Sequence, residues 1–203
     1  ERSGWRHLYL YDLETGNLKN TVTSGDWLVR SVLHFNKDKR ELLIQLGGRV
    51  EGRNPYYREL ARVNIETGEM VILVTGDYDC CIESAPNTGL SCVGDFMVIT
   101  RSRMDEPPVT ELYDQTGEVI LTLEEADISG LPEGWQWPEP VVMKAGDGIT
   151  DIYGVVFFPS DFDPNRKYPV LDGGMMSPFY SLLPTSGCFV EGGAAGGNYF
   201  SME

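Results

Sequence analysis

A hairpin-like segment that recurs three times constrains this sequence more than any other feature. Each copy has an alternating strand, an acidic or amide residue, a Thr-Gly pair and a second β-rich run. The copies are residues 8–16, 60–68 and 111–117, and the β-rich runs are 18–23, 70–74 and 119–123. The turn glycines, Gly16, Gly68 and Gly117, are 52 and 49 residues apart. Glycine at this place supplies the positive φ of a tight hairpin turn.

The spacing of the hairpins predicts the fold class. A period near 50 residues with several strands in each unit is typical of β-propeller blades. Residues 27–35 and 41–46 are expected to form further strands of one unit, and residues 96–102 a strand of a later one. A β-sandwich is the alternative, but its strands usually follow every 8 to 12 residues or so without a longer period. Because a closed ring needs at least about four blades, the sequence predicts an incomplete propeller.

The pattern changes after Leu123. We predict propeller blades over residues 1–128, a proline-rich connector over 129–140 and the first strands of another, incomplete domain over 141–203. The connector contains three prolines and can hold neither a long helix nor a central strand. After it, strands are expected at 141–144, at 151–159 and from Tyr168 onward. The predicted fold class is therefore mainly β.

Composition and charge exclude several partners. The chain has 31 acidic and 16 basic residues and a net charge of −15, so its averaged field repels nucleic acid and anionic lipid. No stretch approaches the roughly 20 apolar residues needed to cross a bilayer. With 41% apolar residues the chain is too hydrophobic to be disordered. We therefore expect a globular protein with no nucleic-acid partner and no membrane segment in this chain.

The four cysteines leave two interpretations open. They are the adjacent pair Cys80 and Cys81, then Cys92, and Cys188 far along the chain. Neighbours on a strand point to opposite faces, so a zinc site is not expected. Cys92 could form a disulfide with either Cys80 or Cys81 in an oxidising compartment. Free thiols packed as small apolar groups are the alternative.

Three stretches carry a family resemblance. They are Gly4-Trp5-Arg6-His7-Leu8-Tyr9-Leu10-Tyr11-Asp12, then Ser102-Arg103-Met104-Asp105-Glu106-Pro107-Pro108-Val109-Thr110-Glu111-Leu112, and the run from Lys144 to Val170 with its Pro159-Ser160-Asp161-Phe162-Asp163-Pro164 turn. The first two resemble blade motifs of the dipeptidyl peptidase IV branch of the prolyl oligopeptidase family. The third resembles the start of the α/β-hydrolase domain of that family. The three stretches also follow one another along the chain in the same order as in the family.

The resemblance implies a fold and an activity. The fold would be a partial β-propeller, made of its last blades, followed by the first strands of an α/β-hydrolase domain. The full-length protein would be a serine exopeptidase that releases N-terminal dipeptides, of Xaa-Pro or Xaa-Ala type, from peptide substrates. A periplasmic or extracellular location is implied as well. In such an enzyme this segment would serve as substrate-gating propeller and scaffold.

The chemistry of a serine hydrolase is missing from these residues. A nucleophile elbow is written Gly-x-Ser-x-Gly, and no such motif occurs. In α/β-hydrolases the base follows the nucleophile, so neither His7 nor His34 can be that base, and a structural role is expected for both. We therefore expect no catalytic residue in this segment. Its substrate-binding residues are unknown from sequence, and neither a metal nor another cofactor is expected.

Other candidate sites are interpreted more simply. The family resemblance implies a tyrosine, shortly after the Tyr168-Pro169 strand, whose hydroxyl helps hold the oxyanion. If Tyr168-Pro169 and Pro178 both match the family, that position is Met175, which cannot donate a hydrogen bond. Tyr180 could take its place only if the turn is shifted. The pair Glu124-Glu125 is expected to be a solvated acidic turn. The glycine run 192–197 lacks a phosphate-loop ending, and Asp161-Phe162-Asp163 is better interpreted as a turn than as a calcium loop. The aromatics Tyr9, Tyr11, Trp27 and Phe35 are expected in the blade core.

Two other functions compete with the peptidase segment. Blades can present a surface to a protein or peptide without any chemistry, which would make the chain a binding module. The departure at Met175 allows an inactive homologue of the peptidase. An open blade edge also exposes unpaired strand hydrogen bonds, so self-association, as a homo-oligomer, is expected.

Overall fold

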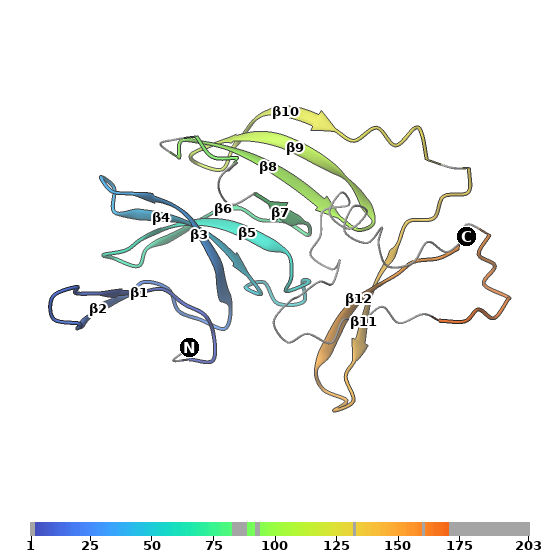
Figure 1. Cartoon of the computed structure of the whole chain (residues 1–203), viewed down its shortest axis with the longest axis horizontal. Coiled ribbons are helices and arrows are strands. Elements are labelled where there is room, and N and C mark those ends of the chain that lie inside the picture. The colour runs from blue at the N-terminus through green and yellow to red at the C-terminus, as the bar shows by residue number, and fades with distance from the viewer. Residues whose placement is uncertain (1–2, 83–88, 92–93, 132, 160, 171–203) are drawn as a thin grey trace. The chain divides into compact units, whose positions relative to one another are not determined.

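The computed structural model describes residues 3–82, 89–91, 94–131, 133–159 and 161–170, and every regular element in them is a strand (Figure 1). The strands are β1 (Tyr9–Tyr11), β2 (Leu18–Thr21), β3 (Leu28–Asn36), β4 (Glu41–Gly47), β5 (Arg58–Asn64), β6 (Met70–Val74), β7 (Asp79–Cys81), β8 (Phe96–Arg103), β9 (Glu106–Asp114), β10 (Val119–Glu125), β11 (Glu139–Lys144) and β12 (Asp151–Val156). By internal contacts the chain divides into two compact units. One comprises residues 1–101 and 110–124, and the other comprises residues 102–109 and 125–203.

Strands β1 to β10 form three sheets that follow the sequence repeat, and β11 and β12 form a fourth, two-stranded sheet. Sheet I is the pair β1-β2, sheet II has the order β3-β4-β5-β6, and sheet III has the order β10-β9-β8-β7. Sheets II and III are four-stranded meanders, in which each strand pairs with the next along the chain. The predicted hairpins are β1-β2, β5-β6 and β9-β10, so all three are confirmed.

The three hairpin turns are built in the same way. Gly16, Gly68 and Gly117 have φ values of 69°, 73° and 88°, which confirms the predicted left-handed conformation. The residue that begins each turn accepts backbone hydrogen bonds with its side chain. Asp12 Oδ1 accepts from Thr15 N at 2.9 Å, and Asp114 Oδ1 accepts from Thr116 N at 2.8 Å. These local bonds explain why an Asp or Asn precedes the Thr-Gly pair.

Two apolar clusters lie between consecutive sheets. The first cluster joins sheet I to sheet II and contains Val22, Trp27, Val29, Ile44, Leu46, Ala61, Val63 and Ile65. The second joins sheet II to sheet III and contains Leu43, Leu60, Val74, Cys80, Ile82, Met97, Ile99 and Tyr113. Because side chains alternate along a strand, neighbours such as Leu43 and Ile44 enter different clusters. Sheet II is therefore apolar on both faces, as a blade between two others requires.

The described segment from β11 to residue 170 is a simple hairpin followed by turns. The two strands pair in register from Glu139 opposite Val156 to Lys144 opposite Asp151. The turn between them is held by Asp147. A hydrogen bond from the Thr150 hydroxyl, with backbone N–H groups of Ile149 and Thr150, lowers the pKa of Asp147 to about 2.

Several sequence-based expectations about this region are wrong in detail. Residues 168–170 do not form the expected strand, because Tyr168 packs its ring 5.3 Å from that of Phe162 and accepts a hydrogen bond from Asp163 N. The strand expected at 151–159 ends at Val156. The strand expected from 141 begins at Glu139, since Pro140 is tolerated in a two-stranded sheet with only one neighbour.

Two expectations about exposed side chains also need correction. The pair Glu124-Glu125 is fully part of strand β10 rather than a turn, although both residues are exposed as expected. Of the aromatics expected in the core, Trp27 is buried, and Tyr9 and Phe35 are half-buried, but Tyr11 is 44% exposed. Leu10, its neighbour on β1, packs against the first apolar cluster, so Tyr11 points to the other face of sheet I.

Candidate functional site

Arginines and two buried carboxylates gather at one end of sheet II. This end comprises the beginnings of β3, β5 and β7, the end of β6 and the loop between β4 and β5. The charged residues here are Arg30, Arg49, Arg53, Arg58, Glu59 and Asp79. The meander brings them together, because antiparallel strands place alternate loops at the same end of a sheet.

Glu59 is a fully buried carboxylate held by three neighbours. Arg49 Nη2 lies 2.9 Å from Oε1, and Arg53 Nη2 lies 3.0 Å from Oε2. The Thr75 hydroxyl donates a further hydrogen bond to Oε1. Burial by itself would raise the pKa of Glu59, but the hydrogen bonds from Thr75 and Arg49 and the charge of Arg53 outweigh it and lower the pKa.

Asp79 is the second fully buried carboxylate, and it joins sheet II to sheet III. Arg58 binds it in a bidentate manner, with Nε 3.0 Å from Oδ1 and Nη2 2.6 Å from Oδ2. The backbone N–H of Arg58 also donates to Oδ1 at 2.7 Å. Burial raises the pKa of Asp79, and the pairing with Arg58 opposes this effect. The pair crosses from β5 to β7 and so connects two sheets by charge as well as by apolar packing.

Arg30 adds a further positive charge at this end of sheet II, where the arginines outnumber the carboxylates. Its Nη2 donates to the Pro55 carbonyl at 3.4 Å, and its guanidinium lies 5.9 Å from the centre of the Tyr56 ring. Burial, together with the nearby charge of Arg58, lowers the pKa of Arg30. Four arginines therefore face two carboxylates here, in a chain whose total charge is −15. Such a site can attract an anionic group and fix the β4-β5 loop, but it holds no nucleophile with a base.

The two histidines have surroundings that suit structural roles. His7 Nε2 lies 2.9 Å from the Gly25 carbonyl oxygen and Nδ1 lies 3.1 Å from the Thr23 hydroxyl. Its ring packs edge-on against Trp27 with 5.0 Å between ring centres. His7 thereby ties the segment before β1 to the loop between β2 and β3. Neither carboxylates nor serine hydroxyls are among these partners, as the expected structural role requires.

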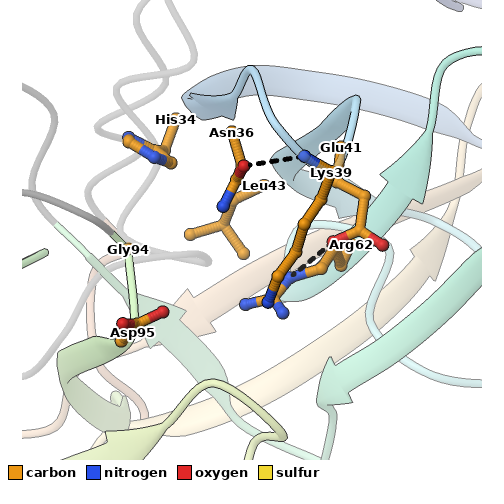
Figure 2. Close-up of a pocket in the computed structure, with 8 residues that line it drawn as sticks. All are labelled: His34, Asn36, Lys39, Glu41, Leu43, Arg62, Gly94 and Asp95. Atoms are coloured by element: carbon orange, nitrogen blue, oxygen red, sulfur yellow. Dashed lines mark hydrogen bonds and ion pairs between the residues drawn. The ribbon is translucent and has the colours of Figure 1, made fainter.

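His34 lines a small hollow at the other end of sheet II (Figure 2). The lining residues are His34, Asn36, Lys39, Glu41, Leu43, Arg62, Gly94 and Asp95. Asn36 Oδ1 accepts a hydrogen bond from Lys39 N, and Arg62 Nε lies 3.8 Å from Glu41 Oε2. The hollow has room for about one water molecule. It is therefore too small to hold a peptide.

The cysteines separate into a buried thiol and a disulfide. Cys80 is free and fully buried, and burial raises the pKa of its thiol to about 12. Cys81 is disulfide-bonded, and its partner lies outside the described residues, as do Cys92 and Cys188. Cys81 is therefore bonded, while its pairing with Cys92 stays a prediction, and Cys80 is a free thiol packed in the second apolar cluster.

Other sequence-derived candidates lie outside the described residues or form turns. Met175, Pro178, Tyr180 and the glycine run 192–197 lie outside the described residues. Asp161 and Asp163 flank a turn in which Phe162 N donates to the Pro159 carbonyl at 3.0 Å, as expected. Within the described ranges, no group of three or more His, Cys, Asp or Glu side chains is arranged to hold a metal ion. No helix in that part of the chain could span a membrane.

Sequence reasoning missed the arginine-rich end of sheet II. Glu59 and Asp79 lie at strand beginnings, where charged residues are normally solvated, so their burial is not expected from composition. The one available sign is that Arg58-Glu59 directly precedes the apolar run of β5 without an intervening turn residue. Only the fold shows that the arginines of a distant loop reach these carboxylates.

Known proteins resemble this chain in both sequence and fold. The chain is 26% identical over 177 residues to a probable dipeptidyl peptidase 4 of Emericella nidulans, which covers 84% of this chain and 21% of that protein. A probable dipeptidyl peptidase 4 of Aspergillus flavus is also 26% identical, over 179 residues, with the same coverage. The chain thus spans about a fifth of the length of these relatives.

Solved structures give the same fold. The structure of Porphyromonas gingivalis dipeptidyl peptidase 4 matches 83% of this chain and 23% of its own, with a TM-score of 0.62 and 22% identity. A Bacteroides ovatus structure assigned as a dipeptidyl aminopeptidase IV matches with a TM-score of 0.63 and 24% identity, over 83% of this chain and 25% of its own. The predicted mainly β class, with a partial propeller, is confirmed.

A family model identifies the chain directly. The model of the dipeptidyl peptidase IV (DPP IV) N-terminal region matches residues 1–108. This segment contains sheets I and II, β7 and β8, the whole of the first apolar cluster and all of the second except Tyr113. The three-sheet repeat, the matched solved structures and this family match agree, and the chain belongs to the dipeptidyl peptidase IV N-terminal region family.

Proposed function

We propose that this chain is a segment of a serine exopeptidase that releases N-terminal dipeptides from peptides. The match of residues 1–108 to the peptidase family carries the proposal. The order of the three sequence motifs, which runs from blade to hydrolase start, supports it. The segment itself provides no nucleophile elbow and no base that follows one, so it contributes scaffold and substrate access rather than chemistry.

We assign the domains of the segment in the same way as from sequence. Residues 1–128 form propeller blades, residues 129–140 form the connector, and residues 141–203 begin the α/β-hydrolase domain. The alternation of buried residues on both faces of sheet II supports the first assignment. The hairpin β11-β12, which follows the connector, supports the third. In the longer protein the peptide substrate would reach the hydrolase through the propeller.

An activity assay with two arms tests this proposal. The purified 203-residue chain is expected to show no turnover of an Xaa-Pro chromogenic dipeptide amide. A protein that continues past Glu203 into a Gly-x-Ser-x-Gly elbow is expected to turn it over, with loss of activity on treatment with a serine-directed inhibitor. An N-acetylated substrate is the matched control, because an exopeptidase that needs a free amino terminus leaves it intact.

Two results would contradict the proposal. Inhibitor-sensitive turnover by the 203-residue chain alone would show that the segment holds catalytic groups of its own. A longer protein with no elbow and no turnover would identify an inactive homologue. In that case the blades would serve as a binding module, and peptide capture without cleavage would be the readout.

A further inference from the structure

Arg6 and Arg30 lie together at the beginning of β3, and both bind neutral backbone oxygens. Arg6 donates through Nε and Nη2 to the carbonyls of Val29 and Arg30. Arg30 donates through Nη2 to the Pro55 carbonyl at 3.4 Å. Among the described residues, neither guanidinium has a carboxylate within ion-pair distance. By contrast, the other three arginines at this end of sheet II each pair with a buried carboxylate.

Both side chains are held in defined positions by the fold. The Arg6 carbonyl accepts a hydrogen bond from Val29 N at 2.8 Å, which fixes Arg6 beside the strand. Arg30 lies over Gly47, where an added Cβ would come within 2.9 Å of Arg30 Nε. The centre of the Tyr56 ring lies 5.9 Å from the Arg30 guanidinium. Donors that are positioned before a ligand arrives lose little conformational entropy on binding.

The chain itself leaves the charge of Arg30 incompletely balanced. Burial lowers the pKa of Arg30, and the positive charges of Arg58 and Arg6 lower it as well. Asp79 opposes this effect, but its carboxylate already binds Arg58 in a bidentate manner. Arg30 Nε is buried and has no hydrogen-bond partner in the described part of the chain. A buried donor without a partner is costly, and an anion beside these arginines reduces their mutual repulsion.

The remaining donors of the two arginines suit a carboxylate. Within the described structure, Nη1 of Arg6 and Nη1 of Arg30 make no hydrogen bond to the protein, so their N–H groups remain available. Arg6 is exposed and Arg30 is half-buried, so a ligand approaches from the side of Arg6. The nearby Arg58–Asp79 pair shows how a guanidinium in this region binds a carboxylate. The planar guanidinium fork matches a carboxylate in this bidentate manner.

We propose that Arg6 and Arg30 together bind a carboxylate group of a peptide. A single carboxylate is favoured over a multiply charged anion, because the net charge of −15 repels such anions from the chain as a whole. The choice of a peptide depends on the proposed function, which makes peptides the substrates. The two arginines contribute to capture of the peptide rather than to its cleavage.

Binding of a rhodamine-labelled peptide to the full 203-residue chain, followed by fluorescence anisotropy at low salt, tests the proposal. The peptide carries several glutamates and an amidated C-terminus. Arg6→Gln and Arg30→Gln are each expected to weaken binding about tenfold, because each removes a charge-assisted hydrogen bond. Arg40→Gln is the matched control, since it removes the same charge from an exposed arginine in the β3-β4 turn. It should bind the peptide like the wild type.

Two further labelled peptides identify the source of the carboxylate. One is neutral with a free C-terminus, and the other is neutral with an amidated C-terminus. Binding of the glutamate peptide assigns the site to side-chain carboxylates, and binding of the neutral peptide with a free C-terminus assigns it to the terminal carboxylate. The variants are compared with whichever of these peptides binds. The neutral peptide with an amidated C-terminus should not bind.

Several results would overturn the proposal. They are no binding of either carboxylate peptide, equal binding of the neutral amidated peptide, and a loss in Arg40→Gln as large as in Arg30→Gln, since net charge alone would then be responsible. Displacement of the peptide by inorganic phosphate at lower concentrations than by acetate, at equal ionic strength, would contradict the preference for a carboxylate. If Arg30→Gln does not fold, as judged by circular dichroism, Arg6→Gln decides, because Arg6 is exposed.

Failure of this site can be told apart from failure of the proposed function. Carboxylate binding by the 203-residue chain, together with an inactive longer protein, would refute the proposed function and leave the site in place. Dipeptide release by the longer protein, with a KM for carboxylate-bearing peptides that neither Arg6→Gln nor Arg30→Gln changes, would refute the site alone.

Discussion

Buried ion pairs show how single residues hold this fold together. Asp79 is fully buried and receives three side-chain hydrogen bonds and one backbone hydrogen bond from Arg58. Such a pair adds little net stability compared with apolar residues of the same size, because both charges lose their water. Removal of one partner is costly, since it leaves the other charge uncompensated. The Arg58–Asp79 pair therefore serves mainly to specify how β5 and β7 are arranged, more than to stabilise the fold.

The substitution Asp79→Ala is expected to destabilise the fold by about 3 kcal/mol, because it leaves Arg58 largely buried without its carboxylate. Chemical denaturation monitored by tryptophan fluorescence measures the change. Glu66→Gln is the control, since the Arg40–Glu66 pair is about half exposed and its loss should cost less than about 1 kcal/mol. Equal effects of the two substitutions would show that burial of the pair is unimportant.

Glu59 predicts a dependence of stability on pH. Its pKa in the folded chain is below its ordinary value of 4.5, so folding favours the ionised form. The resulting stabilisation is fully present above pH 4.5 and is lost as the pH falls through the lowered pKa. The destabilisation caused by Glu59→Gln should therefore be largest near neutral pH and should shrink below pH 4.5. Unfolding free energies of both chains from pH 3 to pH 7 measure it, and a constant difference would refute it.

At the scale of elements, the repeated hairpin turn combines two requirements in one glycine. The turn needs a positive φ at Gly16, Gly68 and Gly117, which an L-amino acid adopts at a cost. Gly68 and Gly117 must also allow the preceding sheet to approach. A hairpin turn that closes a strand pair thus doubles as the point where two sheets meet.

Alanine substitutions separate the two requirements. Gly16→Ala should cost about 1 kcal/mol, because only the left-handed backbone is strained. Gly117→Ala should cost about 3 kcal/mol, because its Cβ also overlaps the Leu73 carbonyl and forces sheets II and III apart. Thermal unfolding at low protein concentration compares them. Equal losses would mean that the approach to Leu73 relaxes without cost.

At the scale of the whole molecule, the chain divides into two units with different amounts of core. The unit of residues 1–101 and 110–124 contains both apolar clusters. The other unit contains the hairpin β11-β12, whose residues are mostly exposed. In the described chain, residues 126–138 between β10 and β11 form no strand. Segments without a ladder of backbone bonds are the preferred sites of proteolysis.

Limited digestion with a glutamate-specific protease is expected to cut first at Glu133 among the glutamates of the described residues, because Glu133 lies in the segment without a strand. The exposed Glu14 and Glu66, which lie in tight hydrogen-bonded turns, are the internal controls. Mass spectrometry of the early fragments identifies the cut. Early cleavage at Glu14 or Glu66 would show that the connector is better protected than the turns.

Features that depend on interactions between residues close together in the sequence could be predicted, and features that depend on tertiary contacts could not. The hairpins were predictable because each turn is stabilised by its own residues, as the bonds from Thr15 N to Asp12 and from Thr116 N to Asp114 show. The strand from Tyr168 was not, because the ring of Phe162 and the backbone of Asp163 engage Tyr168 instead. The bounds of β10 and β11 were missed by a few residues, since pairing with a neighbouring strand sets where a strand ends.

By itself, the sequence determined the repeat, the turn geometry at its three glycines and the absence of a nucleophile elbow from these residues. These follow from backbone conformation and chain order, which depend on neighbours along the chain. Tertiary structure alone decided that Glu59 and Asp79 are buried among arginines, that Tyr11 is 44% exposed and that Gly117 contacts Leu73. Each of these depends on which residues from distant strands meet across a sheet, and packing between sheets carries no local signature in the sequence.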